Sequence, residues 1–504
     1  MQNLDVLIVG AGISGIGAAY HLSTHCSSKR YAILESRNAI GGTWDLFRYP
    51  GIRSDSDMHT LGFSFKPWTE AKAIADGPSI RKYVNETAEE NNIASNIKFE
   101  HVMKSAAWSS EDAKWTVVAE CRGELVTFQC NFLMMCAGYY NYAEGFTPEF
   151  SGLEKYQGTV VHPQHWPEDL DYKGKKVVVI GSGATAMTLV PAMANEATSV
   201  TMVQRSPTYV VSRPDQDRVA NTLRKFMPER WAYALTRFKN TKMQDFVYKQ
   251  TRTNPAKIKA RILGMVRDAL GPDYDVDKHF TPTYNPWDQR LCLIPNADLF
   301  KSIRSGKAEV VTGQIEKITE TGLRMVDGQD LVADILVTAT GLNLQLLGGA
   351  EFTVDGEAVD FPSTYSYKGM MYSDIPNLIQ TFGYINASWT LRADLTSEFA
   401  CRVLNKMDEL GVTQVTPRLR KEDVDMETRN WIEDFSAGYM QRVMHLFPKQ
   451  GSHDPWLNTQ DYYADKKMIR KAALEDGALI FGPSAALVRL GEKPQVTEET
   501  RSAA

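Results

Sequence analysis

Two stretches of this chain share one pattern: an apolar run leads directly into a glycine-rich turn, and the turn leads into a helical segment. The first run, residues 4–9, precedes the turn GAGISG at residues 10–15, and the second, residues 177–180, precedes GSGATA at residues 181–186. Glycines at this spacing bring the backbone close to a bound pyrophosphate, and the N-terminus of the following helix faces its negative charge. The pattern predicts an α/β fold with two Rossmann-like dinucleotide-binding domains.

The two units differ in the residues that follow their second strand. In the first unit the apolar run at residues 31–34 ends at Glu35, placed to accept hydrogen bonds from ribose hydroxyls. In the second unit the run at residues 200–203 leads to Arg205 and Ser206, and an arginine there favours a 2′-phosphate. We interpret the first site as FAD-type and the second as NADPH-type. The alternatives are a glycine turn that only packs a helix on a strand, and an exposed surface arginine.

Composition excludes several classes of protein. The net charge of -5 gives no general attraction to nucleic acid, and the six cysteines include no C-x-x-C pair, which argues against a disulfide framework, a zinc site and a redox dithiol. No apolar run reaches about 18 residues, the length of a membrane span. The N-terminal residues lack the basic segment and cleavage site of a secretion signal. We therefore expect a cytoplasmic protein with isolated, buried thiols.

Residues 213–290 interrupt the alternation of strands and helices. Between Arg218 and Arg267 there are 13 lysines and arginines but only two acids, Glu229 and Asp245. Aromatic and aliphatic residues recur there at helical spacing, which predicts two or three basic amphipathic helices inserted in the second domain. A solvated helical face is the simplest interpretation. Contact with an anionic membrane, which would make the protein membrane-associated, or steering of a phosphate-rich cofactor are the alternatives.

Two further predicted strands indicate where each nucleotide-binding unit ends. Residues 131–136 form an apolar run ending in a small-residue turn, and residues 333–341 repeat that arrangement. We predict an FAD-binding domain in two parts, residues 1–141 and 346–487, around an NADP-binding domain at residues 142–345 with its helical insertion at about 213–290. Residues 97–103 and 114–120 alternate in polarity and predict a small antiparallel layer. Residues 488–504 are polar and predict a flexible tail.

Between the two glycine turns lies a rare arrangement of side chains. Tyr156, Gly158, His162 and Trp166 follow the spacing F/Y-x-G-x-x-x-H-x-x-x-W. His162 and His165 could be a metal pair, but no third ligand stands at suitable spacing, so we expect no metal. A chain with an FAD-type site, an NADPH-type site and no dithiol passes hydride to flavin and then needs an acceptor. Molecular oxygen is the simplest acceptor for the electrons of the reduced flavin.

These features resemble the class B flavoprotein monooxygenases and, within them, the Baeyer–Villiger monooxygenases, whose fingerprint carries phenylalanine where this chain has Tyr156. The likeness extends over nearly the whole chain. The segments GGTWDLFRYPGIRSDSDM, YNPWDQRLCL, TATGLNLQL and GYINASWT are most similar to the branch that activates the thioamide prodrug ethionamide. The resemblance implies that NADPH reduces FAD, that O2 adds to the flavin as a C4a-peroxyflavin, and that a ketone becomes an ester or lactone. Sulfur in thioethers and thioamides is oxygenated at the same site.

The resemblance also implies roles for individual residues. Arg290 would be the catalytic cation, held by Asp55, and Tyr156, Gly158, His162 and Trp166 would couple the domains, with His162 at the hinge. Asn386 and Trp389 are candidates for the substrate pocket. We expect cofactor contacts from Gly10, Gly12, Ser14, Gly15, Glu35, Thr43, Trp44, Asp45, Leu46, Arg53, Ser54, Asp55, Met103, Gly181, Ser182, Gly183, Ala184, Thr185, Ala186, Met187, Thr188, Arg205 and Ser206.

Some alternatives stay open at this point. Arg290 could be an ordinary arginine paired with Asp288. Many relatives carry lysine where this chain has Gln289, so Arg205 and Ser206 would do more of the selection of NADPH over NADH. A flavin enzyme that oxygenates nitrogen or sulfur without acting on ketones, and a non-catalytic membrane-associated redox sensor, are the competing functions. A flavin disulfide reductase would need the missing C-x-x-C. The substrate is expected to be a small ketone or sulfide, and the oligomeric state is open.

Overall fold

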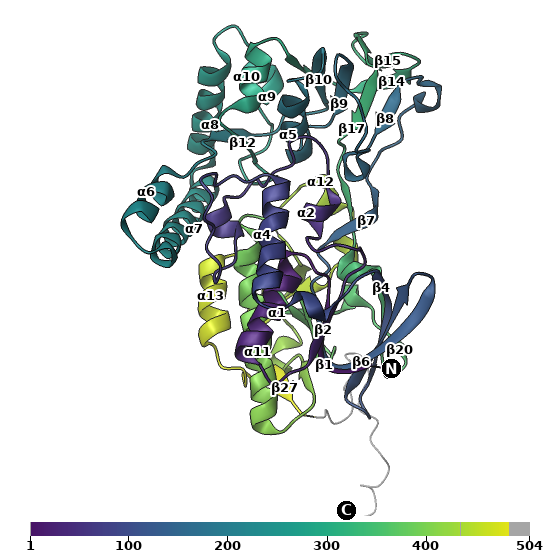
Figure 1. Ribbon diagram of the computed structural model, residues 1–504, viewed down its shortest axis with the longest axis vertical. Helices are drawn as coiled ribbons and strands as arrows, with labels where there is room; N and C mark the ends of the chain where they lie inside the picture. The colour runs from purple at the N-terminus through teal and green to yellow at the C-terminus, as the bar shows by residue number, and fades with distance from the viewer. Residues whose placement is uncertain (1, 434, 483–504) are drawn as a thin grey trace, which may run out of the picture.

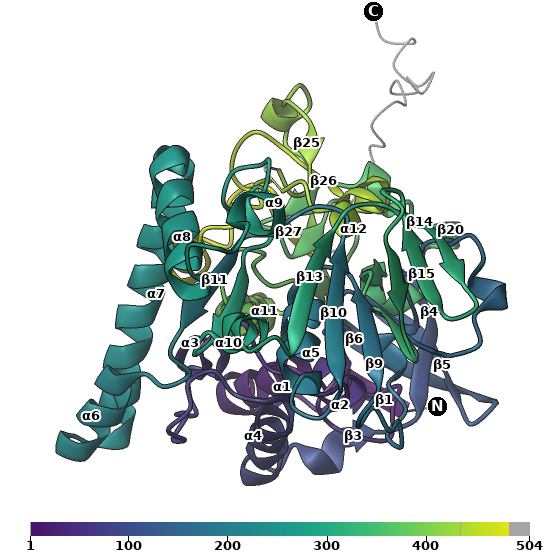
Figure 2. The same ribbon diagram turned by 90° about the horizontal axis from the view of Figure 1, so that it is seen from above.

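The computed structural model describes residues 2–433 and 435–482. It forms two lobes, one above the other in Figure 1, each built on a sheet with parallel strands. The predicted α/β fold class is therefore confirmed, and the helical insertion extends from one edge of the molecule, as the view from above shows (Figure 2). The predicted tail at residues 488–504 lies outside the described residues.

The lower lobe in Figure 1 is made from both ends of the described chain. Its N-terminal elements are β1 (Gln2–Val9), α1 (Ile13–His25), β2 (Tyr31–Leu34), α2 (Thr43–Leu46), α3 (Met58–Leu61), α4 (Gly77–Glu90), β3 (Ile97–Lys98), β4 (His101–Ser109), β5 (Lys114–Cys121) and β6 (Glu124–Met135). Its later elements are β19 (Glu351–Val354), β20 (Glu357–Ala358), β21 (Ser366–Tyr367), β22 (Met371–Tyr372), β23 (Leu378–Gln380), α11 (Trp389–Leu410), β24 (Val415–Pro417), β25 (Arg429–Asn430), α12 (Gly438–Gln441), β26 (Lys449–Gln450), α13 (Tyr462–Lys471) and β27 (Leu479–Phe481).

The sheet of this lobe has the order β20-β19-β4-β5-β6-β1-β2-β3, and β23 also pairs with β6. β6 pairs in parallel with β1 and β23 but antiparallel with β5, so one long strand joins a parallel half to an antiparallel half. β1 is an apolar run because its C-terminal half is covered on both faces.

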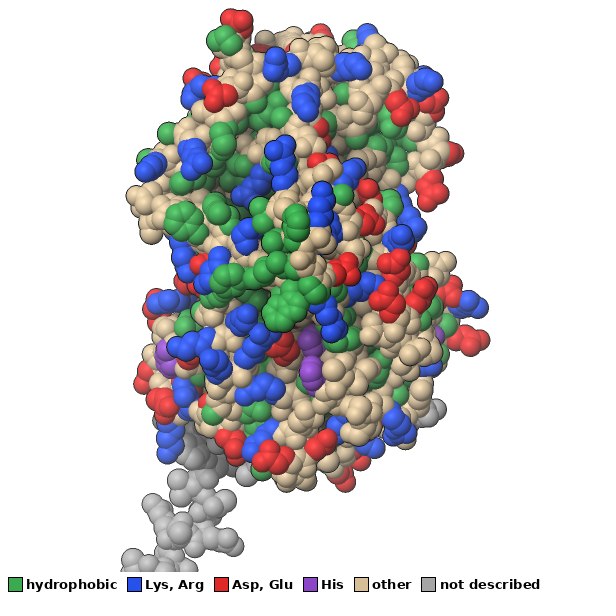
Figure 3. Space-filling view, turned by 60° about the vertical axis from the view of Figure 1, so that its left-hand side comes forward, with side chains coloured by type: hydrophobic (Ala, Val, Ile, Leu, Met, Phe, Trp, Pro, Cys, Tyr) green, Lys and Arg blue, Asp and Glu red, His purple; other side chains and the backbone are tan. Residues whose placement is uncertain are grey.

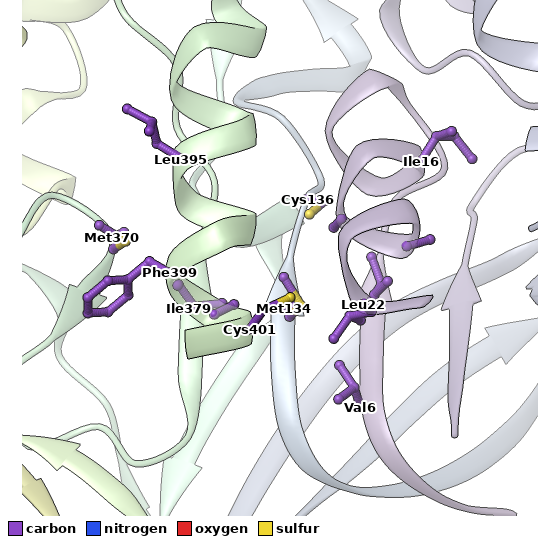
Figure 4. Close-up of a cluster of buried hydrophobic side chains, with 14 of the residues drawn as sticks. Val6, Ile16, Leu22, Met134, Cys136, Met370, Ile379, Leu395, Phe399 and Cys401 are labelled. Atoms are coloured by element: carbon purple, nitrogen blue, oxygen red, sulfur yellow. The ribbon is translucent and has the colours of Figure 1, made fainter. Parts of the chain in front are cut away.

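The core of the parallel half lies between this sheet and two helices. Figure 4 shows Leu22 and Met134 between α1 and α11, while Phe399 extends from the far side of α11 toward Met370, and all three labelled side chains are almost fully buried. The two helices come from opposite ends of the described chain. Packing of α11 on α1 is therefore what completes the N-terminal βαβ unit.

The upper lobe begins and ends with two strands that connect it to the lower one, β7 and β18, which pair antiparallel with each other. Its elements are β7 (Tyr140–Gly145), β8 (Thr159–Val161), β9 (Lys176–Ile180), α5 (Ala184–Met193), β10 (Ser199–Gln204), β11 (Val210–Arg213), α6 (Arg218–Phe226), α7 (Glu229–Thr253), α8 (Pro255–Leu270), α9 (Val276–Phe280), β12 (Cys292–Pro295), α10 (Asp298–Arg304), β13 (Ala308–Thr312), β14 (Ile315–Thr319), β15 (Gly322–Met325), β16 (Asp330–Val332), β17 (Ile335–Thr338) and β18 (Leu342–Leu344).

The main sheet of the upper lobe has the order β13-β10-β9-β17-β8, and all of its strands are parallel. β17 lies beside β9 as β6 lies beside β1, which is the repeat that the sequence suggested. In chain order the helices α6 to α9 come after β11 and before β12, and these two strands pair in parallel with each other. Among the described residues, no helix has the combination of length and apolar character needed to cross a membrane.

One strand differs from the expectation. The antiparallel strand predicted at residues 97–103 is wrong in its first half, because β3 pairs in parallel with β2 and only β4 joins β5 antiparallel. The chain turns between them at Glu100, whose φ is 59°. Alternating polarity marks a strand that is covered on one face, but it carries no information about which neighbour the strand will pair with.

Candidate functional site

A cavity of about 990 Å³ opens where the two lobes meet. Its wall includes the first glycine turn, the loop after β2, the end of β6, Leu342 of β18, and residues from the C-terminal part of the lower lobe. The residues predicted to form the site that line this cavity are Gly10, Gly12, Ser14, Glu35, Thr43, Trp44, Arg53, Ser54, Asp55, Met103, Ala184, Thr185, Thr188, Arg290 and Trp389. The structure thus brings together residues from both ends of the chain.

The first glycine turn forms a narrow cradle at the start of α1. Gly10 has a φ of 105°, and a Cβ atom on it would lie 2.6 Å from the carbonyl oxygen of Cys136. A Cβ atom on Gly15 would lie 1.8 Å from the carbonyl oxygen of Gly10. No acid lies in the first turn of α1, so its amide groups keep their full attraction for an anion. The turn therefore fits the pyrophosphate of a dinucleotide.

Glu35 lies at the end of β2, in the wall of the cavity. Its carboxylate accepts hydrogen bonds from the amide of Ala11 at 2.7 Å and the amide of Arg37 at 2.9 Å. Burial raises the pKa of this carboxyl, and these backbone donors oppose the rise. The Ser36 hydroxyl donates a third hydrogen bond at 3.3 Å. A carboxylate has about four acceptor positions, so Glu35 keeps capacity for a ribose hydroxyl.

Only some residues of the loop after β2 line the cavity. Arg53 donates a hydrogen bond to Asp298 of the upper lobe at 2.6 Å, which ties this loop to α10. Asp45 forms ion pairs with Arg37, Arg48 and Arg81, and both Asp45 and its neighbour Leu46 lie outside the cavity wall. Among the residues predicted to contact the cofactors, Asp45 thus has a clear structural task in holding the loop.

Arg290 lies in the cavity wall beside Asp55, with its Nε atom 3.4 Å from Oδ2. The Asp55 charge raises the pKa of Arg290 well above its ordinary value. The side chain is 36% accessible, and this surface belongs to the cavity wall. Asp288, the alternative partner considered from the sequence, pairs instead with Arg252 at 2.8 Å. Arg290 is therefore a fixed cation available to a bound molecule.

Three tyrosines that sequence reasoning missed surround Arg290. Tyr139 and Tyr140 lie at the start of β7, with their hydroxyl oxygens 2.9 Å apart, and Tyr439 comes from α12. All three line the cavity, and burial raises the pKa of each while the charge of Arg290 opposes the rise. The phenols therefore stay protonated. The pair at residues 139–140 follows a predicted strand and could have been suspected, whereas nothing local marks Tyr439.

Trp389 and Asn386, the two candidates for a substrate pocket, lie differently. Trp389 begins α11, stacks on Tyr139 with ring centroids 5.2 Å apart, and donates a hydrogen bond from Nε1 to Ser14 at 2.7 Å. It therefore closes the C-terminal part of the lower lobe over the first glycine turn. Asn386 is not in the cavity wall, since its side chain donates to the carbonyl oxygen of Gln460 at 2.9 Å.

The second glycine turn is more open than the first. Gly181 is as confined as Gly10, since its φ is 137° and a Cβ atom on it would lie 2.2 Å from the carbonyl oxygen of Ala339, but nothing lies within 4 Å of a Cβ atom built on Gly183. Arg205 and Ser206 are exposed after β10, and the Ser182 hydroxyl donates to the carbonyl oxygen of Ser206 at 3.3 Å. Gly181, Ser182, Gly183, Ala186, Met187, Arg205 and Ser206 do not line the cavity, which only Ala184, Thr185 and Thr188 of this unit reach.

The fingerprint residues lie away from the cavity, against the connecting strands. His162 accepts a hydrogen bond at Nδ1 from the amide of Gln164, so its proton is on Nε2, 3.2 Å from the carbonyl oxygen of Gly341. A Cβ atom on Gly145 would lie 2.0 Å from the His162 ring. The side-chain amide of Gln164 donates a hydrogen bond to the carbonyl oxygen of Asn141 in β7. The Nε2 atom of His165 forms a hydrogen bond with the carbonyl oxygen of Ala143 in the same strand.

The other fingerprint side chains support β8. The Tyr156 hydroxyl donates to the carbonyl oxygen of Ala333 at 3.0 Å, and a Cβ atom on Gly158 would lie 2.3 Å from that hydroxyl. Trp166 is half-buried against the core of the upper lobe. Neither the tryptophan nor the histidine of this motif touches the cavity, so the motif acts on the connection between the lobes.

The match of a family model now gives the class of this protein. The chain belongs to the flavin-binding monooxygenase-like family, whose model matches residues 4–268. That family makes it a flavin-containing monooxygenase.

Individual relatives cover almost the entire chain. It is 54% identical to the FAD-containing monooxygenase EthA of Mycobacterium tuberculosis over 97% of this chain and 99% of that protein. It is 47% identical to the probable FAD-binding monooxygenase AlmA of Acinetobacter baylyi over 98% of this chain and 99% of that protein. The resemblance to this branch of class B flavoprotein monooxygenases, inferred from the sequence, is confirmed.

Solved structures share the fold at lower sequence identity. Oxidized steroid monooxygenase bound to NADP matches with a TM-score of 0.78 and 22% identity, over 95% of this chain and 100% of that one. The OTEMO complex with FAD and NADP (form 1) matches with a TM-score of 0.73 and 18% identity, over 95% and 99% of the two chains. The OTEMO complex holds FAD and NADP, and EthA is an FAD-containing monooxygenase, so the cofactors expected from the two glycine turns are confirmed.

Proposed function

We propose that this enzyme is an FAD- and NADPH-dependent Baeyer–Villiger monooxygenase, which converts a ketone and O2 to an ester or lactone and also oxygenates sulfur in thioethers and thioamides. The observation that carries the proposal is the Asp55–Arg290 pair, which places a fixed cation in the same cavity wall as the first glycine turn. The fingerprint and the similarity to enzymes named as FAD monooxygenases support it.

The first unit would hold FAD. The turn at residues 10–15 would receive its pyrophosphate and Glu35 a ribose hydroxyl, and the cavity is of the size of known cofactor sites. FAD, when bound, accepts hydride from NADPH and supplies the redox chemistry that activates O2. The protein itself needs no side-chain nucleophile and no metal for this chemistry.

Arg290 would stabilise negative charge that develops on the carbonyl oxygen of the substrate. A guanidinium stays protonated in a cavity with little water, and here the Asp55 charge makes its deprotonation still less favourable. Asp55 would fix the orientation of the group, which is what an electrostatic catalyst requires. The neutral tyrosines at positions 139, 140 and 439 can donate hydrogen bonds beside this cation without competing with it for negative charge.

The walls near Arg290 indicate which substrates would enter. Tyr139, Phe382 and Trp389 are in aromatic contact with one another and line the cavity together with Met440. Apolar and aromatic walls favour a hydrophobic molecule with one polar group, which suits a ketone or a thioether.

NADPH would bind across the second turn, with its 2′-phosphate near Arg205 and Ser206. The helix α5 has no acid in its first turn, so its N-terminus can receive the second pyrophosphate. The fingerprint would couple this event to the flavin site, because His162 bonds the backbone between β17 and β18 while His165 bonds β7. The proposed domain division at residues 141 and 345 falls in or beside these connecting strands.

Product analysis tests the proposal directly. Purified yellow protein is incubated with NADPH, O2 and a series of methyl ketones and thioethers, and the products are identified by mass spectrometry. We expect an ester from at least one ketone and a sulfoxide from a thioether. Sulfoxide or N-oxide without any ester would establish the competing N- or S-oxygenating function. NADPH consumption that no organic substrate stimulates would indicate a non-catalytic redox sensor.

A further inference from the structure

The longest helix of the insertion, α7, carries its side chains in an inverted arrangement. The face that packs on the lower lobe is mostly polar and includes Thr236, Arg237 and Thr241. The opposite face exposes Trp231, Leu235, Phe238 and Phe246, which follow one another at helical spacing. A helix of a globular protein normally turns its apolar face inward and its polar face to water.

The inner face of α7 is fixed by specific bonds. Arg237 donates hydrogen bonds to the carbonyl oxygens of His59 and Gly62 at 3.0 and 2.7 Å, and the Tyr233 hydroxyl donates to the carbonyl oxygen of Phe63 at 2.9 Å. Asn240 donates to Asp57 at 2.9 Å. Because these contacts determine the rotation of the helix about its axis, the apolar face cannot turn inward without breaking them.

The outer face gathers the exposed aromatic residues of the molecule. Among the described residues, every phenylalanine or tryptophan that is largely exposed lies on α6 or α7: Phe226 at 82%, Trp231 at 67%, Phe238 at 61% and Phe246 at 59%. We call these four residues together with Leu235 the exposed apolar stripe. In Figure 3 hydrophobic side chains gather on the face that carries these helices, with lysines and arginines around them. An apolar patch with a polar rim marks an interaction site.

The rim of the stripe is positively charged. Much of the positive charge of the insertion has internal partners, such as Arg237 and Lys239, so the basic balance of the sequence overstates what is available. Lys225 and Arg230, however, are exposed next to Phe226 and Trp231 and form no ion pair with any residue that the structure describes. Lys242 lies over the Tyr463 ring at 3.6 Å, and the acids of this region are Glu229 and Asp245, the second of which pairs with Lys249.

We propose that the exposed apolar stripe binds the surface of a membrane that contains anionic lipids. Aromatic side chains enter the boundary between headgroups and acyl chains, and the flanking cations meet the lipid phosphates. A second copy of this chain is a less suitable occupant, since a twofold contact brings a patch against itself and would set the cations around it against like charges. Binding at the surface needs no membrane-spanning helix.

Vesicle flotation tests this proposal without any turnover. The full-length flavin-bound protein is mixed with vesicles of phosphatidylcholine alone or with added phosphatidylglycerol, and the bound fraction is measured. We expect binding to the anionic vesicles that weakens with salt. The variant Trp231→Ser/Phe238→Ser should bind the vesicles at least about tenfold more weakly. Transfer of each aromatic ring out of water raises the binding constant by roughly a factor of ten or more. Lys225→Gln/Arg230→Gln should lose the preference for anionic vesicles.

The control is Val326→Ser/Val332→Ser, which removes two exposed apolar side chains from the β14–β16 sheet and should bind vesicles like the wild type. Bound flavin and thermal stability are measured for every variant, so that a misfolded protein is not counted as loss of binding. Equal binding of wild type and the Trp231→Ser/Phe238→Ser variant, or no binding at all, would overturn the proposal. So would sedimentation showing that the wild type is an oligomer that this variant dissociates.

Discussion

The two glycine-turn units follow one local plan but differ in how closely the rest of the molecule surrounds them. In the first unit Gly15 has no room for a Cβ atom, Glu35 is 3% exposed, and Trp389 closes over Ser14. In the second unit the position of Gly15 is taken by the buried Ala186, and Arg205 is exposed. We infer that the first unit keeps its cofactor through many turnovers, while the second unit exchanges its cofactor with solvent.

The largest effect should come from making the first turn like the second. Gly15→Ala places a Cβ atom against the Gly10 carbonyl oxygen, a contact with backbone that costs about 3 kcal/mol or more. We expect the variant to be purified without yellow flavin. The reverse change, Ala186→Gly, should cost only about 1 kcal/mol and keep the flavin. Flavin content and thermal unfolding measure both, and a fully yellow Gly15→Ala protein would contradict the comparison.

The junction between the units should be next in effect. Arg290→Ala removes the cation that both units face, and the loss of one such donor lowers turnover by about 10²–10³-fold. Flavin should remain bound, because the first turn and Glu35 are untouched. The control is Arg324→Ala, which breaks a similar arginine–carboxylate pair on the exposed β15–β16 hairpin and should leave ketone turnover unchanged. Ester formation by Arg290→Ala at the wild-type rate would refute the role.

A smaller effect should appear in coenzyme selection. Arg205→Ala removes the exposed cation beside the second turn, and kcat/KM with NADPH should fall about tenfold while the value with NADH hardly changes. Because the family resemblance places Gln289 where many relatives carry lysine, we expect the wild type to prefer NADPH, but less strongly than such relatives do. Steady-state rates with the two coenzymes decide this, and equal wild-type values would show that Arg205 does not select.

The smallest effect should come from the hinge. His162→Ala removes the bond to the Gly341 carbonyl oxygen, worth about 1 kcal/mol, and should lower NADPH-driven turnover several-fold while FAD stays bound. His165→Ala, which removes a more exposed bond to Ala143, is the matched comparison and should have the smaller effect. Wild-type rates in His162→Ala would exclude the hinge role.

Acid should act on the same histidine. Burial lowers the pKa of His162 in the folded protein below its ordinary value of 6.5. The unfolded chain therefore binds a proton more readily, so the stability that neutral His162 contributes is present above about pH 6.5 and is lost as the pH falls toward the lowered pKa. Thermal unfolding measured from about pH 7.5 to about pH 5.5 should show a smaller acid-induced decrease for His162→Ala than for the wild type.

Sequence reasoning succeeded where the information is local. The turn at residues 10–15, the acid at the end of β2 and the strand after each unit could be predicted because they depend on backbone conformation and on neighbours along the chain. It was weaker for side chains whose roles depend on distant partners. Asp45 was expected at the cofactor, but three arginines hold it behind the wall, and Asn386 turns away to Gln460. Tyr439 reaches Arg290 only because α12, which lies far along the chain, packs against β18.

The sequence by itself therefore determined the class of this protein, its two nucleotide units, and the acid or arginine that follows the second strand of each unit, since glycine turns and strand ends act through geometry that is fixed locally. Only the tertiary structure decided which partner holds Arg290, which of the basic residues remain available, and which face of α7 meets solvent. These depend on the packing of elements far apart in the chain, where a few specific bonds, such as those of Arg237, fix one of several arrangements that the sequence pattern allows.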